Sequence, residues 1–162
     1  MRAGVDLPSY AAAVERNVMP DGKFGRPAPV VLAMVLCDAI YQDPATQKCT
    51  LLGTFSTINV RKFPATHRQM AVHVAMTDGY GQTKIKLMLT HTNESKDPLF
   101  SQEGTIEFGN PRVVAELNFT VTNLMFHEAG EYRLQVYGND ELLAERRLYV
   151  MDLTQMQQPP TL

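Results

Sequence analysis

The chain has 162 residues, of which 44% are hydrophobic and 20% are charged, and its formal net charge is −2 at pH 7. This composition is typical of one soluble globular domain that is large enough to bury a core without disulfide bonds. The longest apolar run, at 30–37, is too short to cross a bilayer, and basic and acidic residues are mixed along the chain, which argues against membrane and nucleic-acid partners.

The first 28 residues are predicted to form an N-terminal arm outside the main domain, because prolines and glycines recur in them. Ser9 is suited to cap a short helix at about 10–17. Tyr10 and Val14 would share one face of this helix. The arm is then either loosely attached to the domain or a segment in which Tyr10 and Val14 contact a partner.

Two features predict a cytoplasmic location. Charged residues and a proline interrupt residues 1–18, whereas a signal peptide needs a continuous apolar core. The chain has 2 cysteines, Cys37 and Cys49. Since a domain of this size needs no bridge, we expect both thiols to be reduced.

Short segments with strand character follow the arm, and turn residues separate them. Eight such segments span about 30–37, 47–59, 69–77, 83–91, 99–108, 112–121, 131–137 and 142–150. Strands of this length and spacing are typical of a β-sandwich or a β-barrel. The sequence therefore predicts one all-β, antiparallel sandwich domain over residues 29–152, followed by a disordered tail at 153–162.

The segments at 69–77 and 83–91 both alternate apolar and other residues. If their apolar faces coincide and the two strands pair, Val74 lies opposite Leu87. His73 then lies on the outer face and His91 on the inner face. The two imidazoles therefore cannot share a metal ion, although His67 and His127 could approach each other at one end of the sandwich.

Acidic turn residues suggest one alternative function. Asp38, Asp43, Asp78 and Asp140 would gather at the other end of the sandwich if every connection reverses the chain direction. Oxygen ligands from loops bind calcium, so this acidic loop end could bind calcium or a small molecule. Aspartate is also a common turn former, which is the simpler interpretation.

Motifs that would indicate an enzyme are absent from the sequence. It contains no Gly-x-Ser-x-Gly, no phosphate-binding glycine loop, no His-Glu-x-x-His and no Cys-x-x-Cys. A site assembled from loop residues such as Asp38, His67 and His127 is a second alternative. No cofactor is implied by any motif.

Two further pairs of residues are interpreted as structural or partner contacts. Phe63 and Pro64 form an aromatic–proline corner that either plugs the end of the sandwich or anchors a partner protein. Lys48 lies near Asp38 in the sequence, and an ion pair between them would hold the intervening loop.

The end of the chain resembles an immunoglobulin-like domain. Glu128, Gly130 and Tyr132 resemble the tyrosine corner of such domains, which implies that the Tyr132 hydroxyl bonds to the preceding turn. Leu134 stands where the bridging cysteine would lie, and the chain has no tryptophan. The resemblance is therefore to the architecture without its disulfide.

A broader pattern resembles an uncharacterised bacterial family of β-sandwich domains of unknown function, over about residues 28–152. Its residues include Val31-Leu32-Ala33, Thr46-Gln47-Lys48, Leu52-Gly53-Thr54-Phe55, Gly130-Glu131-Tyr132-Arg133 and Leu148-Tyr149-Val150. The resemblance implies a sandwich fold and a bacterial source, and it brings no catalytic residue or cofactor. The leading hypothesis is a noncatalytic module that binds another protein or associates with itself.

Overall fold

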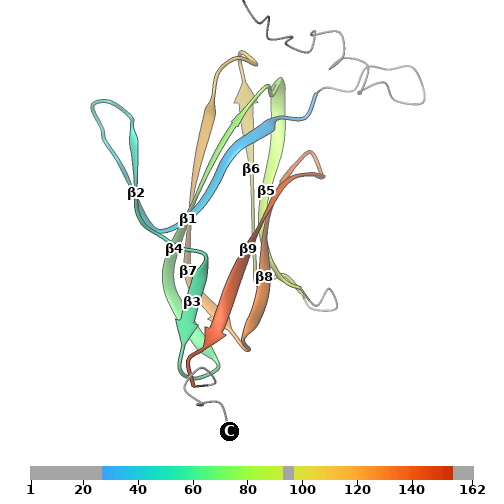
Figure 1. The fold of residues 1–162 in the computed structure, drawn as a ribbon. Helices are drawn as coiled ribbons and strands as arrows, with labels where there is room; N and C mark the ends of the chain where they lie inside the picture. The colour runs from blue at the N-terminus through green and yellow to red at the C-terminus, as the bar shows by residue number, and fades with distance from the viewer. Residues whose placement is uncertain (1–26, 93–96, 155–162) are drawn as a thin grey trace, which may run out of the picture.

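Two β-sheets pack face to face in the computed structural model, which describes residues 27–92 and 97–154 (Figure 1). One sheet has the order β2 (Cys49–Thr54), β1 (Val30–Gln42), β4 (Ala65–Thr77), β7 (Ala115–Phe126). The other has the order β3 (Thr57–Val60), β9 (Glu141–Asp152), β8 (Gly130–Gly138), β5 (Gly81–His91), β6 (Phe100–Phe108). All neighbours are antiparallel except β3 and β9. The predicted all-β sandwich is confirmed.

The strand order is that of an immunoglobulin-like domain. β1, β4 and β7 are neighbours in one sheet, and β9, β8 and β5 in the other, which matches strands A, B, E and G, F, C of such domains. Tyr132 lies near the start of β8, the strand that carries the tyrosine corner. The predicted immunoglobulin-like architecture is therefore confirmed.

One predicted strand is two strands in the structure. The segment at 47–59 divides at Phe55 and Ser56, so that β2 pairs with β1 and β3 pairs with β9 of the opposite sheet. Gly53 has a φ of 65°, which bends the backbone shortly before the chain changes sheets. The described residues therefore contain nine strands instead of eight.

The predicted pairing of Val74 with Leu87 is wrong. Both side chains face the core, but β4 pairs with β1 and β7, whereas β5 pairs with β6 and β8. The turn between β4 and β5 carries the chain from one sheet to the other, so the two apolar faces meet across the core. His73 lies on the outer face as predicted, and its Nδ1 forms a hydrogen bond at 2.8 Å in which Asn118 Oδ1 is the acceptor.

The core lies between the sheets and contains side chains from both. Its largest fully buried members are Tyr132, Phe126, Leu36, Met70, Met76, Ile85, Leu87, Leu89, Leu134 and Leu148. The predicted helix at 10–17, with Tyr10 and Val14, and most of the tail lie outside the described residues. Within the part that is described, no helix is both long and apolar enough to cross a membrane.

Candidate functional site

Two connections at one end of the sandwich are fixed to each other (Figure 1). The backbone N–H of Asp78, in the β4–β5 turn, donates to the carbonyl of Pro111 in the β6–β7 loop at 2.8 Å, and the Thr77 hydroxyl donates to the same oxygen at 3.2 Å. The Phe108 ring occupies the place that a Cβ on Gly79 would take. The turn and the loop therefore form one packed unit.

Large apolar side chains at this end remain exposed. Tyr80 is 58% exposed, Val113 57% and Val114 48%. Leu142, which follows the β8–β9 turn, is 46% exposed. We call these four residues the loop-end patch. They belong to the connections that carry the recognition loops of antibody variable domains, or lie beside them.

The β8–β9 turn is held against β5 by a reciprocal contact. The Asn139 N–H donates to the Lys84 carbonyl at 2.8 Å, and the Lys84 N–H donates to Asn139 Oδ1 at 2.9 Å. Asn139 and Asp140 both have positive φ values, 49° and 68°, as a two-residue type I′ hairpin requires. This contact positions Leu142 on a stiff hairpin.

Charges around the loop-end patch are mainly acidic. Asp78, Asp140 and Glu141 lie in the same connections as the Arg112 guanidinium, and the ammonium of Lys84 beside the β8–β9 turn is paired with Glu103. A carboxylate of Glu103 hydrogen-bonds Lys84 and raises its pKa, and the charge of Asp140 adds to this effect. The patch therefore presents apolar groups within a negative rim.

The structure does not assemble the predicted calcium ligands. Asp43 lies in the β1–β2 hairpin, where its Oδ1 accepts the Ala45 N–H at 2.8 Å, and this bond lowers its pKa. Asp78 and Asp140 form separate turns, and Asp38 lies within β1. Among residues 27–92 and 97–154, no three His, Cys, Asp or Glu side chains are grouped as a metal site requires.

The expected ion pair between Lys48 and Asp38 is not formed. The β1–β2 register places Asp38 opposite Gly53, and the Asp38 carboxylate occupies the place that a Cβ on Gly53 would take. Lys48 precedes β2 at the far end of the hairpin, where its carbonyl accepts the Asp43 N–H at 2.9 Å. The register therefore separates the two side chains along the hairpin.

The candidate catalytic residues line two different hollows. His67 lies in β4 rather than in a loop, and it lines a hollow of about 720 Å³ together with Asp38. His127 lines another hollow of about 440 Å³ between the start of β6 and the end of β7. His67 packs against Phe55 with ring centroids 5.8 Å apart. Asp38 and His67 thus share a hollow that His127 does not reach.

Phe63 and Pro64 differ in exposure. Phe63 is partly buried and packs against the core, whereas Pro64 is exposed. Phe63 therefore contacts the core while part of its surface is accessible, and Pro64 is the more exposed of the two.

Tyr132 forms a corner that joins β7 to β8. It is 1% exposed, and its hydroxyl donates to the Glu128 carbonyl at 2.9 Å. The rings of Phe126 and His91 meet it edge-on, with centroids 5.0 and 4.8 Å away. Gly130 has a φ of 150°, and a Cβ there would lie 3.2 Å from His91 Nε2. Burial is the main cause that raises the Tyr132 pKa.

Sequence reasoning did not identify the loop-end patch. Tyr80 stands in the run Asp78-Gly79-Tyr80-Gly81, which by its residue types predicts only a turn. The side chain of an aromatic residue inside a tight turn can rarely reach the core. The position of Tyr80 in this turn was therefore the one sequence feature that indicated an exposed ring. The adjacent Val113 and Val114 fell at the start of a predicted strand, but β7 begins at Ala115.

Comparisons with solved structures find several proteins at low similarity. An immunoglobulin-like protein of Pseudomonas aeruginosa is 14% identical over 78% of this chain and 98% of its own, with a TM-score of 0.38. The DNA-bound alkylpurine DNA glycosylase AlkC of Pseudomonas fluorescens is 8% identical over 59% of this chain, with a TM-score of 0.43. A β-glucosidase of Kluyveromyces marxianus is 17% identical over 58% of this chain, with a TM-score of 0.39.

These likenesses assign no activity to the chain. It spans 27% of the glycosylase chain and 14% of the β-glucosidase chain. No curated protein matches the sequence. The model of a family of unknown function, DUF6941, matches residues 32–151. The chain therefore belongs to the DUF6941 family of unknown function.

Proposed function

We propose that this protein is a noncatalytic module that binds another protein through its loop-end patch. The observation that carries the proposal is the exposure of Tyr80, Val113, Val114 and Leu142 on connections that are held in place by hydrogen bonds. Rigid aromatic and aliphatic groups are favourable anchors because little side-chain entropy is lost when they are buried.

The rim of the patch indicates the chemistry of the partner. Asp78, Asp140 and Glu141 outnumber Arg112, and the nearby Lys84 is already paired with Glu103. A partner surface with an apolar centre and lysines or arginines around it is therefore complementary. Two copies of this chain that met through their loop ends would bring like charges together. The proposed occupant is therefore a different, basic protein.

Free thiols support a cytoplasmic site of action. Cys37 and Cys49 are both unbridged in the structure, and unbridged cysteines are usual in reducing compartments. Partner contacts through Tyr10, Val14, Phe63 and Pro64 stay predictions.

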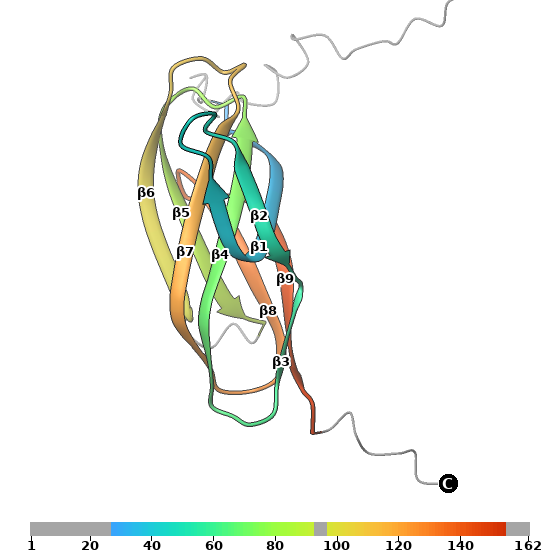
Figure 2. The same ribbon diagram turned by 90° about the vertical axis from the view of Figure 1, so that its left-hand side faces the viewer.

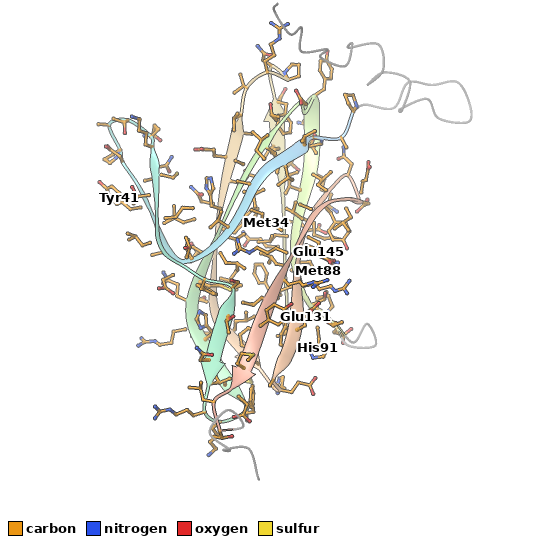
Figure 3. All side chains as sticks on the ribbon, in the orientation of Figure 1. Met34, Tyr41, Met88, His91, Glu131 and Glu145 are labelled. Carbon is orange, nitrogen blue, oxygen red and sulfur yellow. The ribbon has the colours of Figure 1, made fainter. Side chains whose placement is uncertain are left out.

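Photo-crosslinking tests the proposal with a matched control. Tyr80 and Tyr41 are 58% and 57% exposed, but Tyr41 lies on the projecting β1–β2 hairpin (Figure 3). Each is replaced in turn by p-benzoylphenylalanine in the full chain, and adducts are formed in the cells that make the protein. We expect a discrete adduct with a basic protein from position 80 only.

Binding of the purified partner completes the test. Tyr80→Ser and Val113→Ser are expected to weaken its Kd about tenfold, and Tyr41→Ser to leave it unchanged. No adduct at position 80, or equal adducts at both positions, would overturn the proposal.

A further inference from the structure

β6 forms an open edge of its sheet. It is the last strand in the order β3-β9-β8-β5-β6, and it pairs only with β5 through nine residues, Phe100–Phe108. Figure 2 shows β6 at the margin of the sandwich. No proline interrupts it, and within the described residues its backbone groups on the far side have no strand beside them. A long regular edge of this kind is a template for another strand.

The other edges are protected in ways that β6 is not. β3 has four residues. β2 contains Gly53, with a φ of 65°, and β7 is kinked at Asn123, with a φ of 54°. Short, bent and kinked strands are poor templates for pairing. β7 is longer than β6, but its left-handed residue Asn123 divides it, whereas the nine residues of β6 contain no positive φ.

The inner face beside β6 is incompletely filled. Gln102 and Gly104 lie opposite the core residues Leu87 and Ile85, yet both are exposed. No heavy atom lies within 4 Å of the position that a Cβ would take on Gly104. A strand added to β6 would place every second side chain over this space, where an apolar side chain would be buried.

A second apolar space adjoins the start of the strand. The hollow of about 440 Å³ is lined there by Leu99 and Phe100, and by Val121, Leu124 and Met125 from the end of β7. Met125 is 47% exposed. Two inward-facing apolar side chains of an added strand would therefore find partners, one near Gly104 and one at this hollow.

The outer face of β6 carries negative charge. Glu103 and Glu107 lie on it, and Glu103 pairs with Lys84 at 2.9 Å. Glu107 has no ion pair among the residues that the structure describes. An antiparallel pairing of β6 with β6 of a second copy, centred on Gly104, would place these carboxylates in diagonal positions, which is unfavourable. A segment with lysine or arginine on its outer face is complementary.

We propose that β6 binds an extended segment of a partner protein by strand addition, and that this segment alternates basic and apolar residues. Its backbone would continue the sheet, its apolar side chains would fill the space near Gly104, and its basic side chains would lie beside Glu103 and Glu107. The proposal adds a second binding surface to the proposed function and does not depend on the loop-end patch.

The probe is a synthetic peptide of sequence Lys-Val-Lys-Val-Lys-Val-Thr, blocked at both ends. A peptide of the same composition without alternation is its control. We expect the alternating peptide to bind the full chain at least tenfold more tightly, and to slow amide hydrogen exchange within 101–107. Glu107→Lys should weaken its Kd about fivefold, whereas Glu116→Lys on β7 should leave it unchanged.

N-methylation separates strand addition from simple charge attraction. Alternate N–H groups of a strand point to opposite sides. Two peptides are therefore made, one with its odd-numbered and one with its even-numbered amides methylated. The peptide whose methyl groups face β6 should not bind, and the other should bind as the unmethylated peptide does. Equal binding of both methylated peptides, equal binding of the control peptide, or exchange protection elsewhere would overturn the proposal. Tyr80→Ser should not change peptide binding, so this result and that of the loop-end experiment can be read separately.

Discussion

Arg146 on β9 donates a hydrogen bond from Nη1 to the carbonyl oxygen of Met34 on β1, at 2.9 Å. Its Nη2 also donates to the carbonyl of Phe55 at 3.3 Å. β1 and β9 belong to opposite sheets, so one guanidinium joins the two layers at the point where the chain crosses from β2 to β3. The label of Met34 in Figure 3 marks this edge of the sandwich.

Arg146→Met is expected to lower the free energy of unfolding by about 1.5–3 kcal/mol, because two carbonyl groups lose a charged donor. Methionine retains the apolar stem of the side chain, so the change isolates the guanidinium. Arg147→Met is the control, since the Arg147 side chain is 64% exposed and its partners, the carboxylate of Glu131 at 3.5 Å and the side chain of Tyr149, lie on the outer face of the sheet. We expect about 0–1 kcal/mol there. Equal midpoints in urea for the two variants would contradict the bridging role of Arg146.

Gly79 lies against the Phe108 ring, and Gly109 follows Phe108 in the sequence, but the space beside the two glycines differs. The Phe108 ring fills the place of a Cβ on Gly79, whereas nothing lies within 4 Å of that place on Gly109. Gly79→Ala should therefore destabilise the protein by about 1–3 kcal/mol through overpacking, and Gly109→Ala should change stability by less than about 0.5 kcal/mol. The Tm of both variants checks these values. A Gly79→Ala protein with the wild-type Tm would contradict the close contact between Gly79 and the Phe108 ring.

Tyr132→Phe removes the hydroxyl that donates to the Glu128 carbonyl and keeps the ring. Loss of one buried hydrogen bond should reduce stability by about 1 kcal/mol. In Tyr137→Phe the lost partner is Gln135 Oε1, a side-chain atom at 3.0 Å on the outer face of the sheet, so water replaces the bond and the effect should be smaller. If urea titrations show a larger loss of stability in Tyr137→Phe than in Tyr132→Phe, the stabilising role of the bond between the Tyr132 hydroxyl and the Glu128 carbonyl is contradicted.

The sandwich could be predicted because alternation reports which side chains are buried. Ile85, Leu87 and Leu89 alternate strictly, and all three are in the core. Alternation does not report which strand is the neighbour, so it predicts a pair between Leu87 and Val74, which in fact lie in opposite sheets. For the same reason, the sequence predicts one strand at 47–59. Its strand character continues through Ser56, where the chain passes from one sheet to the other.

The loop-end patch and the open edge of β6 could not be predicted from the sequence. The turn residue Asp78 was recognised from local backbone preferences, but the exposure of Tyr80 depends on how the β4–β5 turn packs against the β6–β7 loop. The open edge of β6 depends in the same way on strand order. Both features arise from contacts between segments that are distant in the sequence, and one sequence contains no direct record of such contacts.

The ion pair between Lys84 and Glu103 predicts a measurable titration. A hydrogen bond from Lys84 lowers the pKa of the Glu103 carboxyl, and the charge of Lys86 adds a smaller effect. Because the folded-state pKa is lowered, the stabilisation is present above the unfolded-state value of the carboxyl and is lost as pH falls through the folded-state value. NMR titration should show the Glu103 pKa rising in Lys84→Met, and rising less in Lys86→Met. The same pKa in wild type and Lys84→Met would show that the pair is not formed in solution.

The two cysteines should differ sharply in reactivity. Cys37 is completely buried, and burial is the main cause that raises its thiol pKa above the ordinary value, with Asp38 adding to it. Cys49 is partly exposed, and its sulfur accepts a hydrogen bond from Asn118 Nδ2 at 3.3 Å. Since the thiolate is the reactive form, iodoacetamide at pH 8 should modify Cys49 quickly and Cys37 only as fast as the protein unfolds. Cys49→Ser should therefore abolish the fast phase, and Cys37→Ser should retain it. Rapid modification of both thiols in the native protein would mean that the packing around Cys37 opens without unfolding of the protein.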